Sequence, residues 1–320
     1  MNQLAAGHAY FDIGAMEISP DARLLAYCED DVGRREYTLR VKDLENGTML
    51  ATRIHKVEND IAWMNDGRSL LYIAKDPVTL LGKYVRRHRL GTDPRVTLYG
   101  QDIEDPKGDV FGLTRGLSTE FPGRVNNSPL TESTITGVSV GRALAGGRPV
   151  ACIQFADFVP LAFNQLASEL GSLYWRSNGG WPVPVVVMMP CGGYRPGLGP
   201  FHAQTFESVL AHVPGLDVVM PSTAGDAVGL LNAAFEGGRP TVFLYPKVCL
   251  NDAALATSAD VERQIVRPGV ARRVMAGGNL TLVTWGGTVP LCVRVAENYD
   301  ENARSVFGKT KAAPVLVNQR

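Results

Sequence analysis

Four side chains in the middle of this 320-residue chain have types and spacing that suit chemistry on a planar ring. Glu132 is a lone carboxylate that closes a polar loop, and a helix rich in small residues is predicted to follow it. Phe155 and Phe158 lie about one strand further on, where a planar ring could sit between or against them. His202 follows a glycine-rich loop, and an imidazole can hold or transfer a proton near neutral pH.

Each of these residues also has an ordinary structural explanation. A carboxylate at the start of a helix is favoured by the helix dipole, so Glu132 could simply stabilise the helix that follows it. A phenylalanine at the end of a strand, such as Phe158, usually belongs to the core. A single histidine before a helix, such as His202, is more often a cap or a surface residue. Spacing alone leaves both explanations open.

A further candidate is Ser139, because residues 137–141 fit the Gly-x-Ser-x-Gly pattern of a hydrolase nucleophile. That pattern requires a strand that runs into a tight turn before the serine. The residues before it are polar and follow a proline loop, which favours the start of a helix instead. We expect Gly137, Gly141 and Ala145 to form a face for close helix packing. A serine peptidase relic acting through Ser139 is the minor alternative.

The elements that would position these residues alternate between strand and helix from Arg95 onward. Continuous apolar runs predict strands, and the segments between them predict helices. The predicted strands are 96–99, 150–153, 185–188, 218–220 and 241–244, and the predicted helices are 163–173, 205–213 and 224–235. Such alternation indicates a parallel sheet flanked by helices on both faces. We therefore expect an α/β domain over residues 95–265.

Residues 1–94 follow a different pattern, in which short apolar runs are separated by turn signals such as Asn65-Asp66-Gly67. The predicted strands are 24–27, 37–41, 61–63 and 69–73, with a basic strand at 83–89 whose charges face water rather than RNA. The pattern is typical of propeller blades, but it covers only about one and a half of them. Because a blade buries its faces against its neighbours, we expect a small antiparallel β segment, a poorly anchored appendage with incompletely buried surfaces.

Residues 266–320 begin another α/β unit, with predicted strands near 271–274 and 280–286. From Tyr299 the chain reads as a polar tail. We therefore predict a truncated α/β C-terminal piece.

The stretch from about residue 95 to about 298 resembles the beta subunit of the thiamine-diphosphate-dependent 2-oxo acid dehydrogenases. The segments that carry the resemblance are 104–112, 115–117, 126–133, 155–158 and 192–204. It implies the fold of a transketolase-like pyrimidine-binding domain. Residues 9–94 are similar, in segments 33–44 and 75–81, to the propeller of oligopeptidase B in the prolyl oligopeptidase family. The chain thus looks like a fusion of two truncated genes.

The resemblance assigns roles to three residues. Glu132 matches the glutamate that hydrogen-bonds the N1′ nitrogen of the aminopyrimidine of thiamine diphosphate and so promotes loss of the thiazolium C2 proton. Phe158 matches the aromatic residue that packs against the pyrimidine ring, and His202 matches a histidine at the mouth of the active site. The Gly-Asp-Gly motif that holds Mg²⁺ does not occur in the sequence. In the two-subunit enzymes it lies on the alpha chain, so we expect no metal ligand here.

The implied function is a beta-subunit-like oxidoreductase that decarboxylates a 2-oxo acid and passes the acyl group to a lipoyl carrier. The implied partners are an alpha subunit, a lipoyl acyltransferase and a second beta-like chain, in a heterotetramer. Gln101 and Cys152 stand where the family usually has glutamate. These two departures and the truncated ends favour the alternative, a non-catalytic fusion product that binds no cofactor. Family members often bind potassium through carbonyls near 234–239, which leaves no side-chain pattern to assign.

The composition argues against several other classes of protein. Lysine plus arginine equals aspartate plus glutamate at 32 each, so no net charge favours nucleic acid or an acidic membrane. Five cysteines without a Cys-x-x-Cys pair predict reduced thiols rather than a disulfide framework. The sequence shows neither a signal peptide nor an apolar run of the ~20 residues that span a bilayer. We expect a soluble, cytoplasmic chain that binds neither nucleic acid nor membrane.

Overall fold

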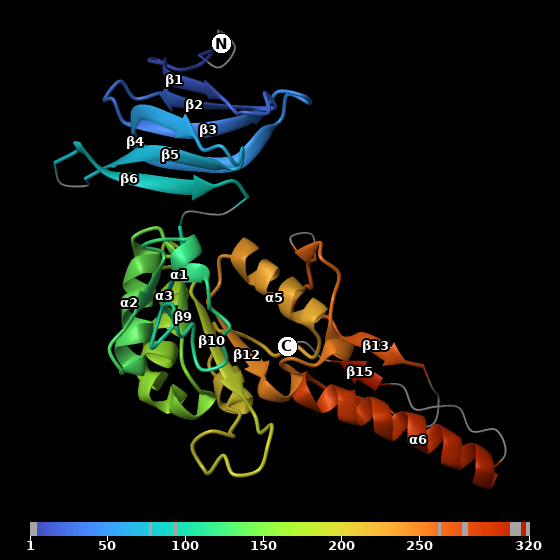
Figure 1. Cartoon of the computed structure of the whole chain (residues 1–320). Coiled ribbons are helices and arrows are strands. Elements are labelled where there is room, and N and C mark those ends of the chain that lie inside the picture. Colours follow the sequence, from blue (N-terminus) through green and yellow to red (C-terminus); the bar gives the residue numbers. More distant parts are fainter. Residues whose placement is uncertain are drawn as a thin grey trace. The chain divides into compact units, whose positions relative to one another are not determined.

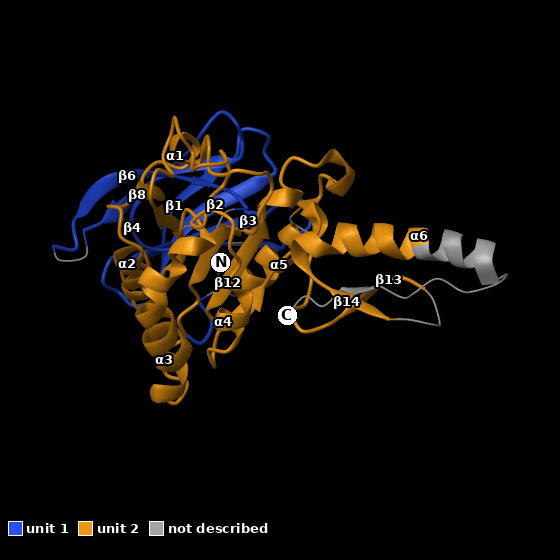
Figure 2. Cartoon of the chain, turned by 90° about the horizontal axis from the view of Figure 1, so that it is seen from below, with its two compact units in different colours: residues 1–94 blue, residues 95–320 orange. Residues whose placement is uncertain are grey.

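The computed structural model describes residues 5–76, 79–91, 95–261, 264–276, 281–307 and 315–317. The chain divides into two compact units, Met1–Pro94 and Arg95–Arg320, which are coloured separately in Figure 2.

Unit 1 is a six-stranded antiparallel sheet in which each strand pairs with the next along the chain (Figure 1). Its strands are β1 (Asp12–Ile18), β2 (Leu24–Asp30), β3 (Tyr37–Asp43), β4 (Met49–Trp63), β5 (Ser69–Lys75) and β6 (Gly82–Arg89). Aspartates order the turns: the Asp66 carboxylate accepts the N–H groups of Arg68 at 2.9 Å and Ser69 at 2.8 Å. The predicted antiparallel segment is confirmed, and β6 is the predicted basic strand.

The sheet of unit 1 buries more of its surface than we expected. Leu39 and Leu70 are fully buried at the centre of an apolar cluster on the sheet. The first strand also lies against the fourth, where the Trp63 indole N–H donates to the Glu17 carbonyl at 2.9 Å. The sheet therefore curls enough to cover part of its own face. The expectation of incompletely buried surfaces is only partly right, because it holds for exposed residues such as Val85.

Unit 2 is built on a six-stranded sheet with the order β11-β12-β10-β9-β7-β8. All its pairings are parallel. The strands are β7 (Val96–Gly100), β8 (Val125–Asn127), β9 (Arg148–Cys152), β10 (Val186–Cys191), β11 (Asp217–Val219) and β12 (Thr241–Pro246). The predicted parallel α/β fold is confirmed. Strand β8 was not predicted, because it is short and mostly polar.

The helices of unit 2 cover the two faces of the sheet unequally. They are α1 (Leu117–Glu120), α2 (Glu132–Leu144), α3 (Gly171–Arg176), α4 (Glu207–Ala211) and α5 (Ala224–Glu236). The connections through α2, α3 and α4 step across the sheet in one direction, and the connection through α5 steps back. Since such crossovers are right-handed, α5 lies on the opposite face from the other three, as Figure 1 shows for α2, α3 and α5. Leu166 and Leu210 belong to the core of the first face, and Leu230 to that of the second.

Shorter helical segments connect these elements. The predicted helix 163–173 is a π-helical stretch that runs into α3, and the predicted helix 205–213 is limited to α4. The short segments are η1 (Ala156–Ala162), η2 (Gln165–Leu170), η3 (Lys247–Cys249), η4 (Ala253–Leu255) and η6 (Gly286–Thr288).

The C-terminal part of unit 2 contains a second small sheet. Strand β15 (Val315–Val317) lies between β13 (Arg272–Met275) and β14 (Leu282–Thr284), and α6 (Val289–Phe307) follows η6. The predicted α/β character is confirmed. The polar tail was predicted from Tyr299 without a helix, and residues 299–307 continue α6. Residues 308–314 and 318–320 of that prediction lie outside the described residues. Of the helices in the described part of the chain, none combines the length and apolar character that a membrane span requires.

Candidate active site

The carboxyl ends of the parallel strands of unit 2 meet along one edge of the sheet. Gly100 at the end of β7 pairs with Asn127 on one side and with Cys152 on the other. Glu132 and Phe158 follow the last two of these strand ends, and His202 lies in the loop after β10. Ligands of open α/β sheets bind at this edge. The topology therefore brings all three predicted site residues to the edge that favours binding.

Glu132 is the first residue of α2, and its residue surface is only 5% exposed. Within the described ranges, no hydrogen bond or ion pair involves its carboxylate. Its place at a helix start fits the helix-dipole explanation. That explanation does not account for the burial, because a buried carboxylate without a partner is costly. The arrangement suits a hydrogen bond to a bound ligand.

Phe158 and His202 are brought together by the fold. Their ring centroids lie 6.0 Å apart with an interplanar angle of 82°. Phe155 contacts both rings, 5.9 Å from Phe158 and 4.7 Å from His202, again edge to face, so the three rings form a triangle. Such edge-to-face pairs contribute about 0.5–1.5 kcal/mol beyond their buried area. The imidazole is therefore held by aromatic edges. Among the described contacts, none joins Glu132 directly to either ring.

Lys247 is a site residue that the sequence analysis missed. It directly follows β12 and is 3% exposed. Its Nζ donates to the His202 carbonyl at 2.5 Å and lies 5.0 Å from the ring centroid of Phe155. Burial lowers the pKa of Lys247, while the neighbouring Asp157 carboxylate partly opposes that shift. A charged residue directly after a fully buried strand was the signal that could have identified it.

Asp157 is the second residue that was missed. Its Oδ1 accepts the backbone N–H groups of Ala203 and Gln204, each at 3.2 Å. Its Oδ2 is buried and has no partner within the part of the chain that is described. Lys247 thus holds the His202 carbonyl while Asp157 holds the two following amides. The backbone around His202 is fixed from both sides by residues that follow β9 and β12.

Ser139 is not placed as a hydrolase nucleophile. It lies inside α2, is fully buried, and its hydroxyl donates to the Ile135 carbonyl at 2.9 Å. The close helix-packing face predicted for Gly137, Gly141 and Ala145 is wrong within this chain. A Cβ added at Gly137 would meet only Gln165, at 4.0 Å, and one at Gly141 would meet nothing within 4 Å.

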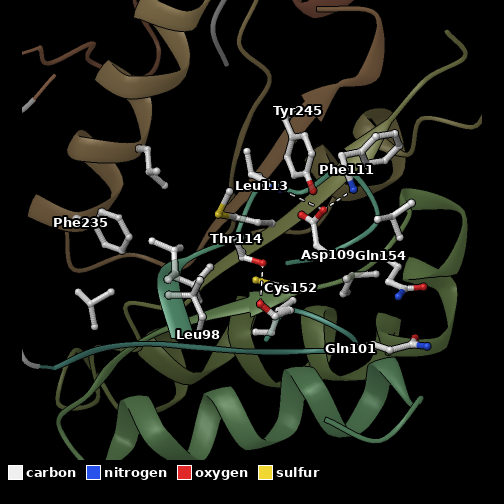
Figure 3. Close-up of a pocket in the computed structure, with 18 residues that line it drawn as sticks. Leu98, Gln101, Asp109, Phe111, Leu113, Thr114, Cys152, Gln154, Phe235 and Tyr245 are labelled. Carbon is white, nitrogen blue, oxygen red and sulfur yellow. Dashed lines mark hydrogen bonds between the residues drawn. The ribbon is translucent and has the colours of Figure 1, made fainter. Parts of the chain in front are cut away.

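Gln101 and Cys152 line a cavity of about 380 Å³ on the α5 face of the sheet (Figure 3). No group of three or more histidine, cysteine, aspartate or glutamate side chains that could hold a metal ion occurs among the residues described. The chain itself therefore shows no side-chain metal centre in that part.

Two family models match different stretches of the chain. The family described as the pyrimidine-binding domain of transketolase matches residues 87–252, and the N-terminal β-propeller domain of prolyl oligopeptidase matches residues 1–107. The 2-oxoisovalerate dehydrogenase subunit beta of Bacillus subtilis (strain 168) is 37% identical over 220 residues, covering 68% of this chain and 66% of the relative. The pyruvate dehydrogenase E1 component subunit beta of Leifsonia xyli subsp. xyli is 35% identical over 221 residues, covering 69% and 64%.

Among solved structures, a split gene transketolase, in an inactive beta4 tetramer, matches with a TM-score of 0.55 at 18% identity. The match covers 70% of this chain and 64% of that one, and it supports the fold. The chain spans about two thirds of the length of the curated relatives it matches, 66% and 64% for those two.

Proposed function

Because the chain belongs to the transketolase pyrimidine-binding-domain family, we propose that it is a beta-subunit-like component of a thiamine-diphosphate-dependent 2-oxo acid dehydrogenase. Together with an alpha subunit it would decarboxylate a 2-oxo acid and pass the acyl group to a lipoyl carrier on an acyltransferase. The names of its relatives support this function. The observation that carries it is the buried, unpartnered Glu132 carboxylate at the binding edge of the sheet.

The residues at this edge fit the pyrimidine end of thiamine diphosphate. Thiamine diphosphate supplies, when bound, the carbanion stabilisation that 2-oxo acid decarboxylation requires. The Glu132 carboxyl would hydrogen-bond a ring nitrogen and share a proton with it, and Phe158 would pack against the ring. The diphosphate and Mg²⁺ would be held mainly by the alpha subunit.

His202 would hold or transfer a proton at the mouth of the site. Its aromatic neighbours restrict rotation of the imidazole, and Lys247 and Asp157 restrict its backbone. Preorganisation of this kind lowers the cost of placing a proton donor during the reaction. Lys247 and Asp157 are thus positioning residues in this proposal.

We also propose the domain organisation and the setting. Residues 1–94 are a partial propeller, 95–265 the pyrimidine-binding domain and 266–320 a truncated C-terminal piece. The beta-like chain would pair with a second copy, and the exposed Gly141 on α2 and Ala145 directly after it leave that side of the helix open to a partner. Five free cysteines suit a reducing compartment, the cytoplasm.

The test combines the chain with an alpha subunit from a 2-oxoisovalerate or pyruvate dehydrogenase. Titration calorimetry should show saturable binding of thiamine diphosphate with Mg²⁺, and the mixture should release CO₂ from a 2-oxo acid. Glu132→Gln keeps the shape of the side chain but removes its acid, so the decarboxylation rate should fall by about 10²–10⁴-fold. Glu236→Gln, at the exposed end of α5, is the matched control and should leave the rate unchanged.

The alternative is a non-catalytic fusion product that binds no cofactor. It is favoured by the neutral Gln101 and Cys152 at positions where the resembling family has glutamate. Absence of saturable cofactor binding in the presence of an alpha subunit would support this alternative. An unchanged rate in Glu132→Gln would contradict the mechanism even if binding occurs.

A further inference from the structure

The cavity on the α5 face of the sheet has the size and lining of a small-molecule site. On that face α5 packs against β12, whereas β7 and β9 contribute side chains that α5 does not cover. The segment between β7 and α1 closes the other wall, with Phe111 and Leu113 among the lining residues. The volume of about 380 Å³ lies within the range of small-molecule sites, about 300–1,000 Å³.

The cavity has an apolar end and a polar end (Figure 3). Leu98 from β7 and Phe235 from α5 lie at one end, while Gln101, Asp109 and Gln154 lie toward the other. A ligand with an apolar body and a polar head matches this lining, because its body is removed from water at the first end and its head meets polar groups at the second. The lining therefore selects for an amphiphilic molecule.

The head group is determined by the charges that face the cavity. Among the described residues that line the cavity, Asp109 is the only acidic side chain, and none is a lysine or an arginine. Burial raises the pKa of the Cys152 thiol to about 12 and that of the Tyr245 hydroxyl well above its usual value, so both are neutral. An anionic head would face the Asp109 carboxylate without a compensating cation.

Asp109 is oriented by its own loop. Its Oδ1 accepts the N–H groups of Phe111 and of Leu113, the latter at 3.3 Å. Within the described part of the chain, Oδ2 has no hydrogen-bond partner. In Figure 3 the carboxylate points into the cavity, and the Tyr245 hydroxyl faces it. One carboxylate oxygen is thus held in place while the other can accept a charged donor.

We propose that this cavity binds a small amphiphilic amine, with its aliphatic or aromatic body against Leu98 and Phe235 and its ammonium head against Asp109. The lining includes none of Glu132, Phe158 and His202, and it approaches the candidate active site where Phe111 packs edge to face on Phe155, with ring centroids 6.0 Å apart.

The test uses the whole chain without a partner and three probes that differ only in the head group: n-octylammonium, n-octanol and n-octanoate. Titration calorimetry at neutral pH should show one saturable site for octylammonium, with a dissociation constant at least tenfold lower than that of octanol. Octanoate should not bind measurably, because its carboxylate faces Asp109. Equal binding of the amine and the alcohol, or binding of octanoate, would overturn the proposal.

Two variants test the contact with the ammonium head and the contact with the apolar body separately. Asp109→Asn keeps the oxygen that accepts the loop N–H groups, and it should abolish the preference for octylammonium over octanol. Asp102→Asn, a nearby carboxylate outside the lining, should keep that preference. Leu231→Trp places a larger side chain in the cavity from α5. It should raise the dissociation constants of octylammonium and octanol at least tenfold, with folding checked by circular dichroism. A preference that persists in Asp109→Asn would also overturn the proposal.

Discussion

Replacement of Lys247 by methionine tests how the loop around His202 is held. Lys247 donates one charge-assisted hydrogen bond, of 2.5 Å, to the His202 carbonyl. A hydrogen bond to a charged group contributes about 1.5–3 kcal/mol, which corresponds to roughly 10- to 150-fold in an equilibrium constant. Methionine also relieves the cost of burying an ammonium, so the global free energy of unfolding should change little. The loss should instead appear as local opening of the loop.

Native-state hydrogen exchange of the Ala203 and Gln204 amides measures that opening. Both donate to Asp157, so they are protected only while the loop is in place. In Lys247→Met their protection should fall by roughly 10- to 150-fold, while the amides of β12 keep theirs. Lys107→Met removes an exposed ammonium from the same unit and should change neither set. Unchanged exchange rates at Ala203 and Gln204, or an equal loss of protection at the amides of β12, would refute the reasoning.

Three further predictions concern stability. The Thr119 hydroxyl and neighbouring donors lower the pKa of Asp105. The ionised carboxylate therefore stabilises the fold above its unfolded pKa of about 3.9. That stabilisation is lost as the pH falls through the lower pKa of the folded state. Asp105→Asn should therefore flatten the dependence of Tm on pH below about 4, measured by thermal melts. Leu166→Ala removes a fully buried side chain and should cost about 2–5 kcal/mol in urea unfolding. Gly108→Ala would place a Cβ 2.3 Å from a backbone atom at a φ of +64°, so it should lower Tm clearly more than Gly116→Ala, where φ is +87° but the space is open.

Much of the fold could be predicted from local patterns. Five strands of the parallel sheet are continuous apolar runs, and burial on both faces is what such runs indicate. Strand β8 carries two asparagines and gains its place only by pairing with β7, so its own residues do not predict it. Residues 299–307 continue α6, which the polar composition of this stretch did not indicate.

The candidate site was only partly accessible from the sequence. Glu132, Phe158 and His202 were found through the motifs around them, and their roles stay predictions. Asp157 lies inside one of those motifs, at 155–158, but nothing there indicated its role, and Lys247 lies in none of them. Each acts through backbone groups that are far away in the chain. Lys247 meets the His202 carbonyl across 45 residues, a contact that no local pattern encodes.

By itself, the sequence determined which residues are apolar and how they alternate along the chain. From that pattern it follows that an antiparallel segment precedes a parallel sheet, whose strand ends can bind a ligand. Periodicity is local, so it can be read without coordinates. Only the tertiary structure decided that Lys247 and Asp157 hold the His202 loop, and that α5 leaves an amphiphilic cavity beside Asp109. Those outcomes depend on which elements the crossovers bring side by side, and that arrangement is set by packing of the whole unit rather than by any single segment.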